Sequence, residues 1–199
     1  MFSGKTKEAL RRASCFASIG KSVVCVSPNI DTRDVHQRLA THDGSLSAAC
    51  VKIDALDEIF HRVVRGGSPT GDAPSVIVID ELQFFDGVGA FIERAERELP
   101  GVIFIATCLN GDSSRRPWKA VSEAIPLADT ITHVTAYCTE CGDGTPAAFS
   151  LRIHEAIEII ESCKSTTELA DGHYRQRGTS QVEIGGKNIY RPVCRMHWN

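Results

Sequence analysis

The sequence predicts an α/β protein in which a mostly parallel sheet with crossover helices is followed by a small metal-binding lobe. Helix-like and strand-like segments alternate over roughly the first 135 residues, which is typical of β-α-β units. The runs Val76–Ile79 and Val102–Ala106 are continuously apolar, as expected of strands buried on both faces. Beyond residue 136 the pattern changes to paired cysteines and Gly-rich turns. We therefore predict two domains, residues 1–136 and 137–199.

Individual elements follow from periodicity and apolar runs. Helices are predicted over residues 7–19, in the segment that follows Asp54 and over about 88–99, and strands over 22–27, 76–79 and 102–106. In the second helix, which Asp54 can cap, one face is apolar and carries Leu56, Ile59, Phe60 and Val63. A further short amphipathic helix is predicted from the spacing of Ile153, Ala156, Ile157 and Ile160.

Composition limits the kind of protein. With 199 residues, 42% hydrophobic and 24% charged, the chain has the make-up of an ordinary globular domain. Its net charge of −3 argues against a general nucleic-acid binder. It has no apolar run near the roughly 20 residues of a membrane span and no signal-peptide pattern at its start. Eight cysteines could suggest a disulfide framework, but a chain this long and rich in core residues does not need one, and we expect a reducing, cytoplasmic location.

A phosphate-binding motif opens the sequence. Ser3-Gly4-Lys5-Thr6 leads into a predicted helix and matches the end of a Walker A loop, G-x-x-x-x-G-K-[ST]. Such a loop needs the glycine for close backbone approach to phosphate, the lysine for the β- and γ-phosphates and the hydroxyl for Mg²⁺. The motif's first glycine and its preceding strand do not appear, so we expect the sequence to begin inside this loop. Taken alone, the fragment fits a plain helix start equally well.

A second motif strengthens this interpretation. Asp80 and Glu81 directly follow the apolar strand Val76–Ile79, as the carboxylates of a Walker B element do. Asp80 would hold Mg²⁺, and Glu81 could act as general base on an attacking hydroxyl. Two acids can also merely solvate a strand end. Because both motifs occur in the correct order on suitable elements, a P-loop phosphotransferase is the better interpretation.

Four residues have the spacing of metal ligands. Cys138 and Cys141 form one x₂ pair, and Cys194 and His197 form another after an excursion of 52 residues. This pattern predicts a Cys₃His site for Zn²⁺. Four protein ligands leave no open coordination position, so the predicted zinc is structural.

Further motifs give the whole chain a resemblance to the type II thymidine kinases. The resemblance is carried by Met1–Thr6, Asp31-Thr32-Arg33, Asp80–Phe85, Leu109-Asn110-Gly111, Arg115–Trp118, Pro126–Asp129, the two ligand pairs, and Ile184-Gly185-Gly186 with Tyr190. These segments are similar to the family's motifs in the same order. Ser113 stands where the family usually has a phenylalanine.

The resemblance implies a P-loop kinase that moves the γ-phosphate of ATP to the 5′-hydroxyl of thymidine. Glu81 is then the general base, and Arg33 stabilises charge during transfer. Residues implied in binding ATP and Mg²⁺ are Ser3, Gly4, Lys5, Thr6, Asp31, Asp80 and Gln83. Those implied in binding the nucleoside are Met1, Phe84, Leu109, Ser113, Trp118, Ser150, Ile184, Gly185 and Tyr190. The zinc-binding lobe would carry a lasso loop that grips thymine, and family members are typically homotetramers.

Two other functions stay open at this point. One is a catalytically impaired kinase-like domain with a structural or assembly role. The other is an unrelated zinc-ribbon module that binds nucleic acid, against which the acidic net charge weighs. Intact Lys5, Asp80 and Glu81 favour an active kinase.

Overall fold

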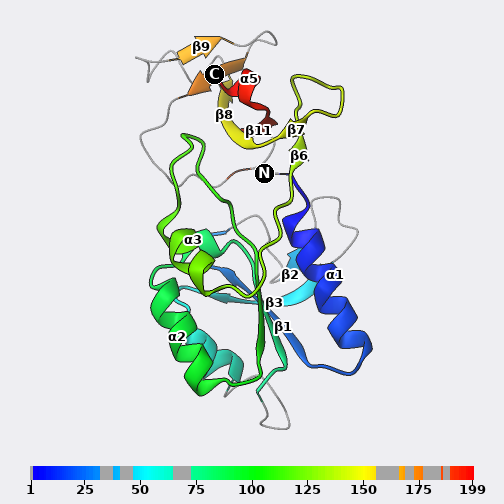
Figure 1. Cartoon of the computed structure of the whole chain (residues 1–199), viewed down its shortest axis with the longest axis vertical. Coiled ribbons are helices and arrows are strands. Elements are labelled where there is room, and N and C mark those ends of the chain that lie inside the picture. Colours follow the sequence, from blue (N-terminus) through cyan, green and yellow to red (C-terminus); the bar gives the residue numbers. More distant parts are fainter. Residues whose placement is uncertain are drawn as a thin grey trace. The chain divides into compact units, whose positions relative to one another are not determined.

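The computed structural model describes residues 2–31, 38–40, 47–64, 73–155, 166–168, 173–176, 185 and 189–199. The chain forms two compact units (Figure 1). The sheet unit comprises Gly4–Asn110 and Trp118–Thr132. The C-terminal unit comprises Met1–Ser3, Gly111–Pro117 and His133–Asn199. The domain boundary predicted near residue 136 stays a prediction.

The sheet unit is built on a five-stranded, mostly parallel sheet. In spatial order its strands are β2 (Arg38–Ala40), β3 (Ser47–Ile53), β1 (Val23–Pro28), β4 (Val76–Ile79) and β5 (Ile103–Ala106). Strand β1 pairs in parallel with β3 and β4, and β4 pairs in parallel with β5. Strand β2 runs antiparallel to β3. The predicted α/β class and parallel sheet are therefore confirmed.

Helices cover both faces of this sheet. The α1 helix (Lys5–Ser18) lies on one side, and the π-helical turn η1 (Ile59–Val64) and α2 (Val88–Glu98) lie on the other (Figure 1). Side chains of β4 alternate between the two layers: Val78 packs with Ala9 and Leu10 of α1. Ile77 and Ile79 join the larger cluster beneath η1 and α2. All four residues of β4 are buried, which explains why this strand is apolar throughout.

The second predicted helix differs from expectation in one detail. Its apolar face is buried as predicted, at Leu56, Ile59, Phe60 and Val63. However, the backbone N–H groups of Asp54 and Ala55 donate to the carboxylate of Glu58, at 2.7 and 3.0 Å. Glu58 therefore folds back onto the start of this segment, and the helix itself is a π-helical turn over Ile59–Val64. A cap at Asp54 would accept from the N–H groups of the residues that follow it and stays a prediction.

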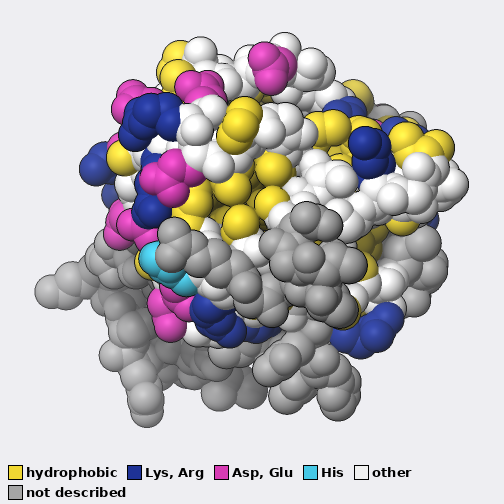
Figure 2. All heavy atoms as spheres, turned by 90° about the horizontal axis from the view of Figure 1, so that it is seen from below, with side chains coloured by type: hydrophobic (Ala, Val, Ile, Leu, Met, Phe, Trp, Pro, Cys, Tyr) yellow, Lys and Arg dark blue, Asp and Glu magenta, His cyan; other side chains and the backbone are white. Residues whose placement is uncertain are grey.

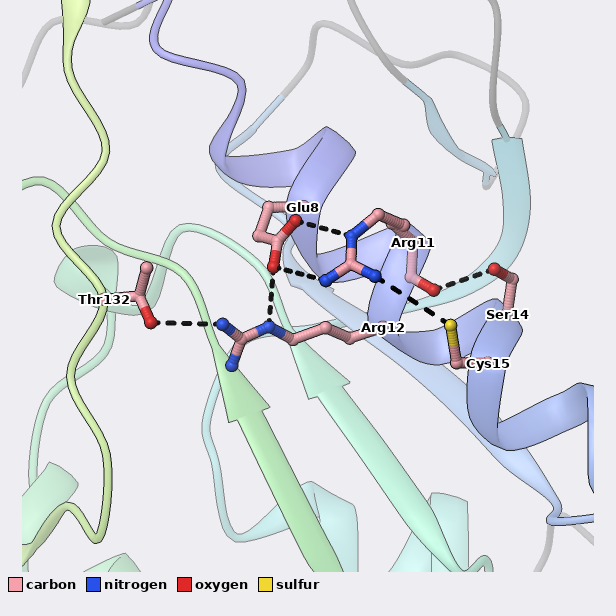
Figure 3. Close-up of polar contacts among 6 residues, drawn as sticks. All are labelled: Glu8, Arg11, Arg12, Ser14, Cys15 and Thr132. Atoms are coloured by element: carbon pink, nitrogen blue, oxygen red, sulfur yellow. Dashed lines mark hydrogen bonds and ion pairs between the residues drawn. The ribbon is translucent and has the colours of Figure 1, made fainter.

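After β5, the sheet unit continues through short helices. The α3 helix (Lys119–Ala124) and the turn η3 (Ile125–Leu127) follow the loop of residues 111–117. Arg12 of α1 donates a hydrogen bond to Thr132 at 3.1 Å, while Glu8 accepts bonds from both Arg11 and Arg12 (Figure 3). These contacts fix the end of the sheet unit against its first helix.

The C-terminal unit is mainly antiparallel. Strands β6 (Ala136–Tyr137) and β7 (Pro146–Ala147) form a two-stranded pair. A four-stranded sheet follows, in the order β11 (Tyr190–Val193), β8 (Phe149–Glu155), β10 (His173–Gln176) and β9 (Thr166–Glu168). The short helix α5 (Arg195–Trp198) comes last.

The helix predicted from Ile153 onward is wrong at its start. Ile153 lies in β8, where it is buried and pairs with Arg175 of β10. The other three positions of that prediction, residues 156, 157 and 160, lie outside the described residues. Ile153 shares the C-terminal core with Leu151 of the same strand, so its burial follows the two-residue period of a strand.

Hydrophobic side chains also reach the surface. Viewed from below, at the end where the parallel strands begin, they gather in the middle of the face (Figure 2). The large exposed hydrophobic residues of the sheet unit include Ile19, Ile30, Ile103, Ile125, Leu127 and Ile131. Within the described part of the chain, the helices lack the length and apolar character needed to cross a membrane.

Candidate functional site

The start of α1 has the backbone of an anion-binding loop. Gly4 caps the helix with φ 79° and ψ 21°, a left-handed conformation that glycine adopts without strain. Lys5 and Thr6 occupy the first turn, where free N–H groups and the helix dipole favour anions. Ser3, the residue before, falls in the C-terminal unit.

Asp80 links this helix to the sheet. It follows β4 directly, and the hydroxyl of Thr6 donates to its Oδ2 at 3.1 Å. The hydroxyl of Thr107, which follows β5, donates to its Oδ1. Burial and the neighbouring Glu81 carboxylate raise the pKa of Asp80 to about 6, although Thr107, Lys5 and Thr6 oppose this rise. A cation at this position would therefore stabilise the ionised form.

Glu81 is held in an unusual backbone conformation beside Asp80. Its φ of 51° and ψ of 46° are left-handed, which is uncommon for a residue with a side chain and worth examination as a functional feature. The side-chain amide of Gln83 donates to its carboxylate. The carbonyl oxygen of Gln83 accepts from the backbone N–H of Leu109 at 3.1 Å. Glu81 and Gln83 are both buried, so these bonds hold the carboxylate in place.

Thr107 was missed by the sequence reasoning. It is buried, and its backbone nitrogen and oxygen bond to Ile79 and Leu82, at 2.9 and 2.8 Å. A polar residue directly after a strand that neighbours β4 was the available signal. In parallel sheets, ligands bind outside the carboxyl ends of the strands.

In the C-terminal unit, four predicted metal ligands come together. The ligand atoms of Cys138, Cys141, Cys194 and His197 all lie within 4.8 Å of one another. The His197 Nδ1 atom is 3.4 Å from the sulfurs of Cys141 and Cys194 and 3.6 Å from that of Cys138. The Cys141 and Cys194 sulfurs are 3.8 Å apart. The cluster has the composition and compactness to hold a metal ion.

The electrostatics of this cluster favour thiolate at two of its three cysteines. Burial opposes ionisation of Cys138, but hydrogen bonds from backbone N–H groups, chiefly that of Cys194, and from His197 lower the pKa of its thiol to about 6. A backbone hydrogen bond from His197 lowers the pKa of Cys194. Burial and Cys138 raise the pKa of Cys141 to about 11. Thiolate is the form that binds metal.

Comparison with known proteins shows which family this chain resembles. A family model described as thymidine kinase matches residues 1–198. The chain is 35% identical to thymidine kinase a of Arabidopsis thaliana over 198 residues, covering 100% of this chain and 71% of that protein. It is 34% identical to the thymidine kinase of Oryza sativa subsp. japonica, covering 63% of that protein. A thymidine kinase from Mesoplasma florum is 33% identical over 197 residues, which is 85% of its length.

The chain belongs to the thymidine kinase family. Family membership directs attention to the residues predicted to bind nucleoside, several of which lie in the sheet unit. There the rings of Phe84 and Trp118 meet edge to face, with centroids 5.8 Å apart. The indole N–H of Trp118 is buried and finds no acceptor among the described residues. The backbone N–H of Leu109 donates to the side-chain oxygen of Gln83, the residue before Phe84.

Other predicted nucleoside-binding residues of this thymidine kinase family member lie in the C-terminal unit. Ser150 of β8 pairs with Pro192 of β11. Tyr190 pairs with Arg152 two residues further along β8. The hydroxyl of Tyr190 accepts from the buried guanidinium of Arg152 at 3.1 Å. Arg152 was not predicted, since an arginine in a strand gives no sequence signal of burial.

The other residues predicted to bind ATP or nucleoside, or to act in catalysis, lie in several different parts of the chain. Asp31 follows β1 and is buried, and its backbone carbonyl accepts from the Lys52 side chain at 2.8 Å. Gly185 is half-buried, and a Cβ at its position would clash with the Ile189 side chain. Met1, Arg33 and Ile184 lie outside the described residues. The roles assigned to all of these residues stay predictions.

Proposed function

We propose that this chain acts as an ATP-dependent thymidine kinase through a reaction centre formed by Lys5, Thr6, Asp80 and Glu81. The observation that carries the proposal is the hydrogen bond from Thr6 to Asp80, which joins two motifs 74 residues apart in the sequence. Membership of the thymidine kinase family supports thymidine as the phosphate acceptor. It does not favour the impaired-kinase and nucleic-acid-binding alternatives.

The donor half of the site would bind ATP with magnesium. Lys5 supplies positive charge at the helix start, and Thr6 and Asp80 supply the oxygen ligands that Mg²⁺ prefers. When bound, magnesium would neutralise charge that develops on the transferred phosphate. Burial raises the pKa of Asp80 to about 6, and such a cation would favour its ionised form.

Glu81 would take the proton from the acceptor. In this step the 5′-hydroxyl loses its proton to Glu81, its oxygen bonds to the γ-phosphorus, and the bond from that phosphorus to the bridging oxygen of ADP breaks. The amide of Gln83 donates to the Glu81 carboxylate and so orients the oxygens that would accept the proton. Arg33 would stabilise charge in the transferred group.

The four-ligand cluster of the C-terminal unit fits zinc. Tetrahedral bond lengths of about 2.3 Å to sulfur and 2.0–2.1 Å to nitrogen imply about 3.8 Å between sulfurs and about 3.6 Å between sulfur and nitrogen. The Cys141–Cys194 sulfur separation of 3.8 Å and the three sulfur–nitrogen separations of 3.4–3.6 Å agree with these values, and all four ligand atoms lie within 4.8 Å of one another. We propose a structural Zn²⁺ on Cys138, Cys141, Cys194 and His197, in a lobe that carries the lasso for thymine. A homotetramer in the cytoplasm completes the proposal.

The test of the reaction centre is Glu81→Gln. Glutamine keeps an oxygen that can accept from Gln83, so folding and ATP binding should persist. Turnover of thymidine should fall by about 10²-fold or more, a usual contribution of a general base. Glu96→Gln on the exposed part of α2 is the matched control and should keep wild-type turnover. Unchanged turnover in Glu81→Gln would show that another group takes the proton.

A further inference from the structure

The loop of residues 111–117 is closed upon itself. Gly111 and Pro117 form a β-bridge at its base. Inside the loop, Asp112 is buried, and its carboxylate accepts from the backbone N–H groups of Ser114 and Arg116, both at 2.8 Å. The Arg116 guanidinium donates to the same carboxylate at 2.8 Å. These hydrogen bonds between the loop's own residues hold it in one conformation.

The middle of the loop is held from outside by Trp198. The indole N–H of Trp198 donates to the backbone carbonyl of Ser113 at 3.2 Å. The Arg115 guanidinium lies over the Trp198 ring, 3.6 Å from its centroid, within the range of a cation–π interaction. Arg115 has a φ of 62°, a strained conformation for a non-glycine residue that persists only when its surroundings fix it. Trp198 supplies such surroundings.

Trp198 is itself fixed by the metal cluster and by β8. Its backbone N–H donates to the carbonyl of Cys194 at 3.0 Å, and it directly follows His197 in α5. Its ring also packs against Phe149, the first residue of β8, at a centroid distance of 6.3 Å. Trp198 therefore joins the loop and β8 through its side chain and the ligand cluster through its backbone.

We propose that Trp198 is a positioning residue for thymidine binding, because it locks the loop that carries Ser113 onto the metal cluster. The proposal rests on the proposed function in one respect: Ser113 is taken to face the nucleoside. Trp198 makes no contact with substrate in this role. It restricts the loop before substrate arrives, which lowers the entropy lost on binding. Loss of Trp198 should therefore weaken thymidine binding and leave phosphate transfer largely intact.

The experiment compares Trp198→Ala, Trp198→Phe and Met196→Ala in the full chain. Met196 lies on the same short helix and is 83% exposed, so its substitution is the matched control. For each variant we would measure bound metal, hydrogen exchange at the Ser114 and Arg116 amides, kcat, and KM for thymidine and for ATP. In Trp198→Ala both amides should exchange faster, and the thymidine KM should rise about tenfold. Metal content, kcat and the ATP KM should each stay within about twofold of wild type.

Trp198→Phe keeps a ring beneath Arg115 but lacks the N–H donor to Ser113. Its amide exchange rates and thymidine KM should therefore lie between those of wild type and Trp198→Ala. Met196→Ala should match wild type. Wild-type exchange and KM in Trp198→Ala would overturn the proposal. If Trp198→Ala loses its metal, Trp198→Phe decides: faster exchange with metal retained supports the proposal, and wild-type exchange overturns it. Absence of thymidine phosphorylation by the wild type would contradict the proposed function, while exchange would still report whether Trp198 holds the loop.

Discussion

At the scale of single residues, the Asp80 carboxylate accepts hydrogen bonds from two hydroxyl groups, those of Thr6 and Thr107. Thr6, Asp80 and Glu81 belong to short patterns with fixed chemistry, and the structure brings Thr6 and Asp80 into contact. Thr107, Asp112 and Arg152 act through bonds to partners that the sequence does not pair with them. Their contributions depend on which strand ends and loops the fold brings together.

Ser113 allows a residue-scale prediction. Its backbone carbonyl accepts the Trp198 bond, so a new side chain at this position need not break that contact. Ser113→Phe would restore the aromatic ring usual in the family. Stacking of a base on an aromatic ring is worth about 1–3 kcal/mol, so the thymidine KM should fall by about tenfold. Steady-state kinetics beside a Ser114→Phe control would measure this, and an unchanged or higher KM would place Ser113 away from the base.

At the scale of elements, periodicity predicted α1, β1, β4, α2 and β5 of the sheet unit, missed β2, β3 and α3, and failed at β8 of the C-terminal unit. Strand β4 and the helices α1 and α2 each bury an apolar run or stripe that repeats with their own period. The prediction that β5 is buried on both faces is wrong, because it pairs only with β4 among the described strands and is at most half-buried. Strand β8 carries buried Leu151 and Ile153 two residues apart. Joined to three later apolar residues, Ile153 also fits a helical spacing, so the sequence pattern was ambiguous and pairing with β10 and β11 decided it.

The metal cluster yields a prediction at the same scale. Cys194 is both a proposed ligand and the residue that precedes α5, so Cys194→Ser should release the metal and unfold the C-terminal unit. Freshly purified wild type should contain about one zinc per chain by elemental analysis, and the variant little or none. Cys15→Ser, which alters an exposed cysteine of α1, should keep its zinc. Wild-type protein purified without chelator and free of zinc would refute the assignment.

At the scale of the whole molecule, the notable feature is the edge of the central sheet. Strand β1 pairs directly with β4, and β4 pairs directly with β5, with no gap between them. Among the described strands, β5 pairs only with β4. Ile103 of β5 is 42% exposed, whereas every residue of β4 is buried. An added parallel strand would therefore fit beside β5.

This placement gives a final prediction, for an extended chain. An apolar strand of about 5–6 residues, followed by Gly-Pro and fused ahead of Met1, should cover β5 and lengthen the phosphate-binding loop. A few new hydrogen bonds at about 1 kcal/mol each would stabilise the fold by roughly 2–4 kcal/mol. For a domain of this size that corresponds to a rise in Tm of about 5–10 °C.

The extended chain should also bind ATP more tightly, because its added backbone N–H groups would cradle phosphate. The measurements are melting temperature, ATP affinity and thymidine phosphorylation of the extended and original chains purified in parallel. An extension of equal length made of Ser and Lys is the control, since it adds chain without apolar surface for Ile103 to pack against. Equal melting temperatures and ATP affinities for all three would mean that no added strand pairs with β5.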